Sequence, residues 1–253
     1  MLSILLLSAM SSIFAVVIVS YMTIRMIQND GIKESMQIYL EQITREMDSD
    51  YYDMIGIVNQ MSPDGLIGSV TERYLSSNDN YDRYLEQKFL REELIKLGYV
   101  NTKLLGITYY DPKEQKELIG NFNVRVLDPS YQTISKVVVG ADNTIQAMHD
   151  SYLGIKETPV VSVMRRVSFG NQKMLDIYAE MEPDMSVSDQ LNKEKWPYTY
   201  MEMDENGIVQ YSNNPVIVQG QKILSELPKK EGHAVTNQEG YKIMVYRSTI
   251  GYA

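Results

Sequence analysis

MQIYLEQITREMDSDYYDMIGIVNQM, residues 36–61, decides the expected fold of this chain. Apolar side chains recur in it at alternating steps of four and three residues, the spacing of a heptad seam on one helix face. The seam positions are Met36, Leu40, Ile43, Met47, Met54, Ile57 and Met61, with Asp50 at the position left over. The pattern fits either a spine helix on the protein's own sheet or a dimer seam. Because methionine specifies partners poorly, we expect a spine with part-time dimer contact.

An apolar run, MLSILLLSAMSSIFAVVIVSYMTI, precedes the seam at residues 1–24, and the first charged residue is Arg25. Roughly 20 apolar residues are needed to cross a bilayer core. A signal peptide has a shorter apolar region with a basic stretch before it and a cleavage site after it, and neither is evident here. A buried core helix would show polar faces at its ends. We therefore predict an uncleaved transmembrane helix at 1–24 that continues into a spine or stalk helix at 25–62.

Beyond the seam, Ser62-Pro63-Asp64-Gly65 predicts a turn. Two shorter helices are expected next, over residues 66–75 and 81–97, with Gly98 as the stop of the second. In the second helix, the apolar residues that share a face are Leu85, Phe89, Leu90 and Leu94.

From residue 104 the pattern becomes extended, rich in β-branched and aromatic residues between turn signals. The expected strands of this part are LLGITYY (104–110), VRVL (124–127), TPVVSVMRRVSF (158–169) and MLDIYAEME (174–182). A turn is expected at 111–114, and a short helix with loops within 130–154. Later come a strand pair at 197–203 and 208–212, a short helix at 221–227, and a strand pair at 233–236 and 241–248. One more strand is expected to begin at 249–253, so this last module is expected to be C-terminally incomplete. The expected fold class is α+β.

Composition excludes several functions. The formal net charge is −9, which argues against a nucleic-acid groove, because such a groove needs clustered lysine and arginine. The chain has no cysteine, so disulfides, thiolate catalysis and cysteine-based zinc sites are excluded. The two histidines, His149 and His233, fall in different modules, and we expect His149 in an exposed loop. The segment from Glu202 to Gly207 resembles the first half of an EF-hand calcium loop. The twelfth position of that loop, which needs a bidentate glutamate, is Asn213, so we expect a hairpin turn instead. We expect no catalytic residues, no metal and no cofactor.

The order of these elements carries a family resemblance. Its later part rests on MEMDENGIVQYSNN (201–214), VQGQKILSEL (218–227) and GYKIMVYRSTIGYA (240–253). Its earlier part rests on GITYYDPKEQKELIG (106–120) and PVVSVMRRVSFGNQKMLDIYAEME (159–182). Together these resemble the extracellular double Cache (tandem PAS-like) region of YesM-type sensor histidine kinases.

The resemblance implies a membrane-distal PAS-like module at 63–190 and a membrane-proximal one at 191–253. It implies an extracytoplasmic sensor from about residue 25 onward, a small-molecule ligand or a solute-binding protein as partner, and a weak homodimer. Cache domains that bind amino acids share an arginine followed by Trp-Tyr, whereas Trp196, the only tryptophan, lies in the connector between the modules. The ligand therefore stays open. The alternatives are the same sensor on a chemoreceptor or a cyclic-dinucleotide enzyme, and a membrane-tethered binding or adhesion module without signalling.

Candidate ligand-binding residues lie in the distal module. Arg165 and Arg166 are adjacent in an apolar strand, so they point to opposite faces, and a guanidinium suits carboxylates, phosphates and sugar hydroxyls. The alternative for either is a structural ion pair. Arg125 in VRVL is a further candidate by the same reasoning. Tyr109, Tyr110 and Tyr178 are candidates for stacking on a small ligand, with core packing as their alternative.

Overall fold

The computed structural model describes residues 2–122, 136, 140–154, 159–170, 172–183, 199–204, 206–224, 232–238 and 241–247. Side chains are described throughout these ranges except at 2–9, 11, 12, 121, 122, 232–238, 241, 242, 244, 246 and 247. The helices are α1 (Leu2–Met61), α2 (Leu66–Ser76) and α3 (Asn80–Val100). The strands are β1 (Leu104–Asp111), β2 (Lys116–Phe122), β3 (Thr144–His149), β4 (Val160–Phe169), β5 (Lys173–Met181), β6 (Met201–Met203), β7 (Val209–Ser212), β8 (Gly232–Gln238) and β9 (Tyr241–Arg247).

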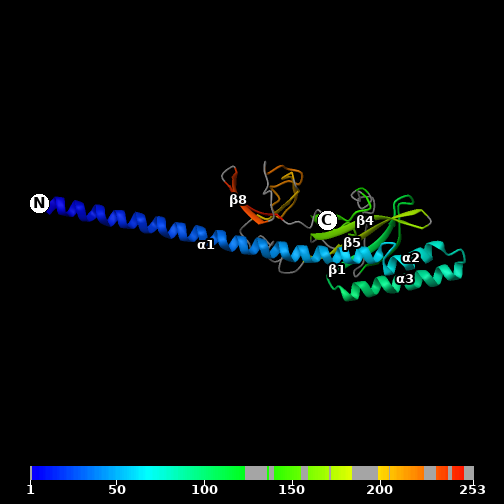
Figure 1. Cartoon of the computed structure of the whole chain (residues 1–253). Helices are drawn as coiled ribbons and strands as arrows, with labels where there is room; N and C mark the ends of the chain where they lie inside the picture. Colours follow the sequence, from blue (N-terminus) through cyan, green and yellow to red (C-terminus); the bar gives the residue numbers. More distant parts are fainter. Residues whose placement is uncertain are drawn as a thin grey trace.

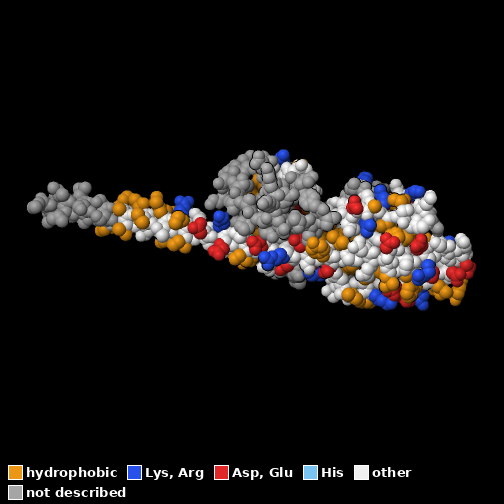
Figure 2. Space-filling view, in the orientation of Figure 1, with side chains coloured by type: hydrophobic (Ala, Val, Ile, Leu, Met, Phe, Trp, Pro, Cys, Tyr) orange, Lys and Arg blue, Asp and Glu red, His pale blue; other side chains and the backbone are white. Residues whose placement is uncertain are grey.

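Helix α1 is continuous over 60 residues, about 90 Å at the usual helical rise. Its N-terminal part projects away from the rest of the molecule (Figure 1). Apolar side chains between Ile13 and Ile27 are exposed on this projecting part, as Figure 2 shows. Within the described part of the chain, no helix holds a stretch both long and apolar enough to cross a membrane. The transmembrane helix was predicted over 1–24, and the side chains at 1–9, 11 and 12 of this range are not among those that the structure describes.

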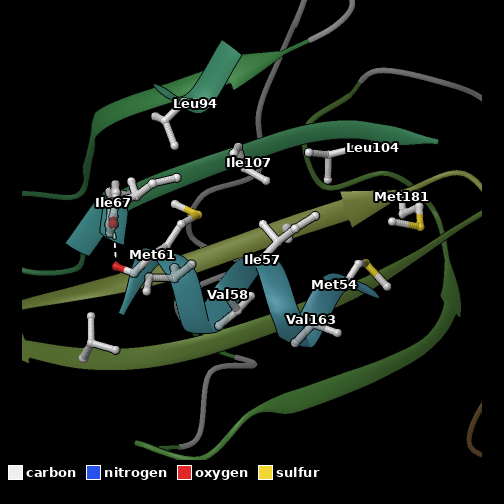
Figure 3. Packing of buried hydrophobic residues seen from close by; sticks show 14 of the residues in the cluster. Met54, Ile57, Val58, Met61, Ile67, Leu94, Leu104, Ile107, Val163 and Met181 are labelled. Atoms are coloured by element: carbon white, nitrogen blue, oxygen red, sulfur yellow. Dashed lines mark hydrogen bonds between the residues drawn. The ribbon is translucent and has the colours of Figure 1, made fainter. Parts of the chain in front are cut away.

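The C-terminal half of α1 packs on one face of the sheet, which confirms the spine interpretation of the seam. Five of its seam positions are buried in the core, namely Ile43, Met47, Met54, Ile57 and Met61. Figure 3 shows Met54, Ile57 and Met61 beside side chains of the sheet such as Ile107 and Val163. Met36 and Leu40, nearer the N-terminus, are only half-buried. Dimer contact along this helix stays a prediction.

The turn and the two shorter helices follow the sequence pattern with two exceptions. The Gly65 amide donates to the Ser62 carbonyl at 2.8 Å, which confirms the turn that ends α1. Helix α3 continues through the buried Gly98 to Val100, so the predicted stop is wrong; packing overrides the low helix propensity of glycine. The buried face is also narrower than predicted, because Leu90 and Leu94 are buried whereas Leu85 and Phe89 are each 44% exposed.

The main sheet has five antiparallel strands in the order β2-β1-β5-β4-β3. The long N-terminal helix and this sheet confirm the α+β fold class. Strand β3 lies within the segment 130–154, where a short helix with loops was predicted, so the prediction is wrong for 144–149; Lys136 of the same segment is helical. Its polar–apolar alternation extends only over 144–147, which is short for a strand signal, and as an edge strand β3 is mostly half-buried. The predicted strand at 124–127 lies outside the described residues.

A second group of strands lies along α1, between its projecting part and the five-stranded sheet (Figure 1). It holds two hairpins, β6–β7 and β8–β9, where strand pairs were predicted. The predicted helix at 221–227 is wrong for its first four residues, since Lys222 bridges Ile208 and the Ile223 amide donates to the Gly207 carbonyl. Residues 225–227 lie outside the description. The module bounds 63–190 and 191–253 stay predictions.

Candidate functional site

The two faces of the main sheet have different chemistry. Side chains alternate between faces along a strand, so Arg165 and Arg166 on β4 point in opposite directions, as predicted. Arg165 faces α1, where its Nη1 donates to Asn59 Oδ1 at 3.2 Å and to Ser62 Oγ at 3.4 Å. Arg166 points to the opposite side. The face on α1 is apolar, and the other carries buried charges and hydroxyls.

We call this second surface the polar face. Its residues come from β1, β4 and β5 and are Tyr110, Ser162, Arg166, Asp176, Tyr178 and Glu180. The strand register brings them together, since Asp176 pairs with both Tyr110 and Arg166, and Glu180 pairs with Ser162. All six are buried except Arg166, whose side chain is 28% exposed. A face that served stability alone would be apolar, because burying charges costs free energy.

An ion pair occupies one end of the polar face. Arg166 Nε donates to Asp176 Oδ1 at 2.6 Å, and Arg166 Nη2 donates to Asp176 Oδ2 at 2.9 Å. This fork geometry is the strong, bidentate form of the contact. The hydrogen bond and charge of Asp176 raise the pKa of Arg166. The structural ion pair, weighed as the alternative for these arginines, is therefore present at Arg166.

A second carboxylate, that of Glu180, holds the loop after β3 against the polar face. Its Oε2 accepts hydrogen bonds from the Tyr178 hydroxyl at 2.6 Å, from the Tyr152 amide at 3.1 Å and from the Leu153 amide at 3.4 Å. Its Oε1 accepts one from the Ser151 hydroxyl. Burial raises the pKa of Glu180, and these donors offset only part of that effect. The Glu180 carboxylate thus bonds three consecutive residues of the loop, Ser151 to Leu153.

His149, at the end of β3, also contacts the polar face. Its Nδ1 lies 2.6 Å from the Asp150 carbonyl oxygen, which can only accept, so Nδ1 carries the proton. Its Nε2 therefore accepts from the Ser162 hydroxyl at 2.7 Å. Its ring stacks on Tyr152, with centroids 4.1 Å apart. Burial lowers the pKa of His149, and the prediction of an exposed loop histidine is wrong.

The chemistry of this arrangement favours binding. Ser162 and His149 lie at the distance of a nucleophile and its base, but Ser162 has no exposed surface in this structure. No group of three potential metal-ligating side chains occurs among the described residues. The polar face brings together a guanidinium, two carboxylates and several hydroxyls, groups that suit a polar ligand, and of its residues Arg166 alone is partly exposed in this structure.

The structure separates the candidate ligand-binding residues into two groups. Tyr110, Arg166 and Tyr178 share the polar face. Tyr109 and Arg165 lie on the α1 side, where the Tyr109 hydroxyl donates to the Met61 carbonyl at 2.5 Å. Arg125 lies outside the described residues.

Three residues of this face, Ser162, Asp176 and Glu180, were not singled out from the sequence, and His149 beside it was expected in an exposed loop. A signal for two of them was present in MLDIYAEM (174–181), where Asp176, Tyr178 and Glu180 alternate with apolar residues inside a strand. Polar side chains at every second position of an otherwise apolar strand indicate one polar face. No comparable signal marks His149, because its strand was not recognised.

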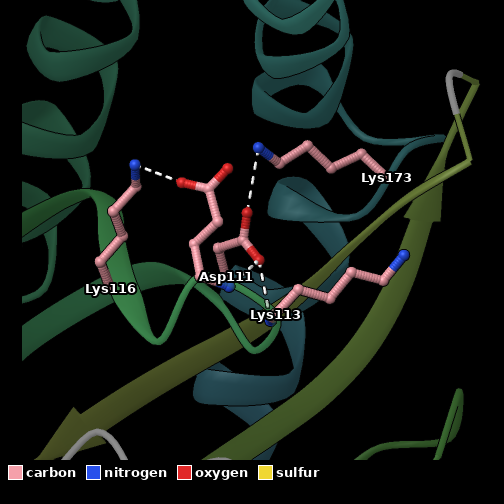
Figure 4. A network of polar contacts seen from close by, with 5 residues as sticks. Asp111, Lys113, Lys116 and Lys173 are labelled. Atoms are coloured by element: carbon pink, nitrogen blue, oxygen red, sulfur yellow. Dashed lines mark hydrogen bonds and ion pairs between the residues drawn. The ribbon is translucent and has the colours of Figure 1, made fainter.

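Another polar network fixes the outer end of the sheet, at the β1–β2 turn (Figure 4). Asp111 Oδ1 accepts from the Lys113 amide at 2.9 Å and from the Glu114 amide at 3.1 Å. Its Oδ2 pairs with Lys173 Nζ at 3.0 Å, and Lys116 pairs with Glu114. Burial alone would raise the pKa of Asp111, but these amides and the Lys173 ammonium together lower it. This network ties β1 to β5 and is structural.

No family model matches the chain, and a search of curated proteins finds no match. Among solved structures, the sensor domain of the V. cholerae histidine kinase DctB is similar, with a TM-score of 0.47 and 13% identity over 76% of this chain and 70% of that one. The ligand-binding domain of Mlp24 with asparagine is also similar, with a TM-score of 0.48 and 15% identity over 83% of this chain and 85% of that one. Neither likeness assigns the chain to a family, so the site is interpreted from its own residues.

Proposed function

We propose that the chain is the extracytoplasmic ligand-sensing region of a membrane-bound sensor histidine kinase of the YesM type. In this proposal the polar face contributes to the ligand site, and α1 carries the signal towards the membrane. The observation that carries the proposal is the buried polar face itself. Clusters of buried titratable side chains are more frequent at functional sites than in purely structural cores.

Two further features support a membrane setting. The projecting part of α1 exposes apolar side chains on all sides between Ile13 and Ile27, which is unfavourable in water and favourable in a bilayer. The strands β6 to β9 lie nearer to this end than the main sheet does. The polar face would then belong to the module farther from the membrane. A weak homodimer along α1 and a solute-binding protein as an alternative partner remain part of the proposal.

Signalling would follow from population shift. A ligand that binds two arrangements of the polar face with different affinity shifts their equilibrium by that difference. Helix α1 contacts the main sheet through Met54, Ile57 and Met61, so a change in the sheet's packing would act directly on the helix. The helix is uninterrupted from there to its projecting end, which makes it suited to carry a small displacement.

The test is a ligand screen with a matched pair of variants on β4. The full chain in detergent is screened by thermal unfolding against amino acids, sugars, organic acids and short peptides. A ligand at about 100 times its dissociation constant stabilises by about 2.7 kcal/mol, a shift of several degrees. We expect at least one compound to stabilise wild type and Arg165→Gln but not Arg166→Gln, each measured against its own unliganded midpoint.

A second matched pair tests the aromatic part of the polar face. Tyr178→Phe removes a hydroxyl from the polar face, and Tyr109→Phe removes one from the α1 side. A ligand of the polar face should lose affinity in Tyr178→Phe and keep it in Tyr109→Phe. A compound whose stabilisation is equally strong in Arg166→Gln and Tyr178→Phe binds elsewhere and contradicts the proposed site.

A further inference from the structure

Four elements meet at one carboxylate, that of Glu202 on β6. Glu202 Oε2 accepts from the Met148 amide of β3 at 2.9 Å, which ties the second group of strands to the main sheet. Glu202 Oε1 accepts from the Tyr200 hydroxyl at 3.1 Å. Tyr211 of β7 packs near Tyr200, with ring centroids 6.4 Å apart. We call this meeting point the Glu202 joint.

The Tyr200 hydroxyl has two acceptors within reach but only one hydrogen to donate. One acceptor is Glu202 Oε1 at 3.1 Å, and the other is Met47 Sδ on α1 at 3.3 Å. An ionised carboxylate is the far stronger acceptor, so it takes the hydrogen while Glu202 is charged. A protonated Glu202 still accepts the Met148 amide on Oε2, and its own hydroxyl on Oε1 donates to Tyr200. The Tyr200 hydrogen is then directed to Met47.

We propose that the Glu202 joint is a proton-controlled contact between α1 and the second group of strands, in which Tyr200 donates to Met47 only when Glu202 is protonated. Proton uptake would strengthen the attachment of the strands to the spine helix, and proton loss would weaken it. The inference stands apart from the proposed ligand site, since it concerns the environment's pH and a different set of residues.

Glu202 changes its protonation state in a pH range where such control can operate. Removal from water raises the pKa of Glu202 to about 7, although the Met148 amide and the Tyr200 hydroxyl act in the opposite direction. Both states are therefore accessible near neutral pH. The described charged and titratable groups around the joint are Tyr51, Asp48 and Asp50 on α1, Lys103 paired with Asp50, Tyr200, Tyr211 on β7, and Asp150 after β3.

The tyrosines among these neighbours do not reproduce the same titration. The nearby tyrosines have pKa values raised above their ordinary range, mainly by burial, so they stay protonated near neutral pH. Lys103 Nζ lies 2.8 Å from Asp50 Oδ1, which favours the charged form of both. His149 also titrates, with a pKa that burial lowers from its ordinary value, but its ring points to Ser162 on the polar face. A variant of His149 is therefore needed to separate its contribution to the pH response from that of Glu202.

The test measures a distance across the joint as pH changes. The chain contains no cysteine, so Ser49→Cys on α1 and Val216→Cys in the loop after β7 provide two unique sites for spin labels. Both positions are exposed in this structure. Distance distributions are recorded for the full chain in lipid nanodiscs, without ligand, between about pH 5.5 and about pH 8.5, which brackets the proposed titration. We expect a short, narrow distribution at low pH that becomes longer or broader with a midpoint about 7.

Two variants of the joint and two control variants decide the result. Glu202→Gln keeps an acceptor for Met148 and donates permanently to Tyr200, so it should show the low-pH distribution at every pH. Tyr200→Phe removes the shared hydrogen and should abolish the pH response, whereas His149→Asn and the surface control Glu92→Gln should keep it. A wild-type distribution that does not change with pH, or a response that persists in Glu202→Gln, overturns the proposal. Because no ligand is added, neither outcome bears on the polar face as a ligand site.

Discussion

The Met148 amide donates to the Glu202 carboxylate at 2.9 Å although the two residues are 54 positions apart in the chain. The next residue, His149, is bonded through its ring to Ser162 on the polar face. Neighbouring residues at the end of β3 therefore connect two regions, the proposed ligand face and the Glu202 joint. A displacement of this end of β3 would therefore move residues at both the polar face and the Glu202 joint. The two proposals share this structural element, but neither depends on the other.

Glu202 makes stability fall as pH rises. Its folded-state pKa of about 7 lies above the ordinary value of 4.5, so the folded chain binds the extra proton between these values. Folding stability should therefore decrease as pH rises through this window and level off above it. Glu202→Gln should remove this decrease, worth up to about 3 kcal/mol. Chemical denaturation at a series of pH values measures it, and an unchanged slope in the variant would show that Glu202 is not the group responsible.

His149 should have the opposite effect. Burial lowers its folded-state pKa below the ordinary 6.5, so the unfolded chain binds more protons just below that value. Stability should then rise with pH through this window and be constant above pH 6.5. His149→Asn should abolish the rise and cost about 1–3 kcal/mol at neutral pH, since the buried Ser162 hydroxyl loses its partner. The double variant with Glu202→Gln should be nearly flat across both windows.

Much of the scaffold follows from local sequence patterns. The heptad from Met36 to Met61 predicted the spine helix because its period is helical and its apolar side is continuous. The turn at Ser62 and the hairpin at Asp111 were predictable because proline, glycine and aspartate favour turns through their own backbone chemistry. Strand β3 and the path of 221–224 were not predictable, because their conformation is set by pairing partners elsewhere in the chain.

The candidate site was less accessible to sequence analysis. The adjacent arginines indicated opposite faces, but only the register of β1, β4 and β5 shows that Tyr110 and Arg166 flank Asp176. The Glu202 joint has no local signature at all. Glu202 sits in a short strand near Asp204 and resembles a surface acid. Its partner Met148, and the Met47 that accepts from Tyr200, come from distant segments.

The Arg166–Asp176 pair should respond unequally to loss of each partner. Arg166→Gln leaves the fully buried Asp176 carboxylate without its cation and should cost about 3–5 kcal/mol. Asp176→Asn leaves a guanidinium that is 28% exposed and reaches water, so about 1–2 kcal/mol is expected. Urea denaturation of both single variants and the double variant gives the coupling energy. Equal costs would mean that water reaches the Asp176 carboxylate.

Gly68 should be required by the close packing of α2 on the end of α1. A Cβ at this position would overlap the Ser62 carbonyl, which is backbone and belongs to a tight turn. Gly68→Ala should therefore destabilise by about 1–3 kcal/mol, as overpacking does. Gly56→Ala is the matched control, because Gly56 lies in α1 with nothing near its absent Cβ and should gain about 0.5–1 kcal/mol. If both variants are stabilised, the helices are less tightly packed than the structure has them.

Dimer contact along α1, if it occurs, must use a face other than the buried seam. Ile43, Met54 and Ile57 pack in the chain's own core, so cysteines there should not cross-link two chains. Ile38 and Tyr52 are exposed on the same side of the helix, two heptads apart, with Arg45 midway between them. We expect Ile38→Cys and Tyr52→Cys to give disulfide-linked dimers in membranes, and Met54→Cys to give none. Cross-linking of Met54→Cys but not of Tyr52→Cys would mean that the buried seam opens and pairs between two chains. If Ile38→Cys, Arg45→Cys and Tyr52→Cys all give no dimer, the spine dimer is removed from the proposal.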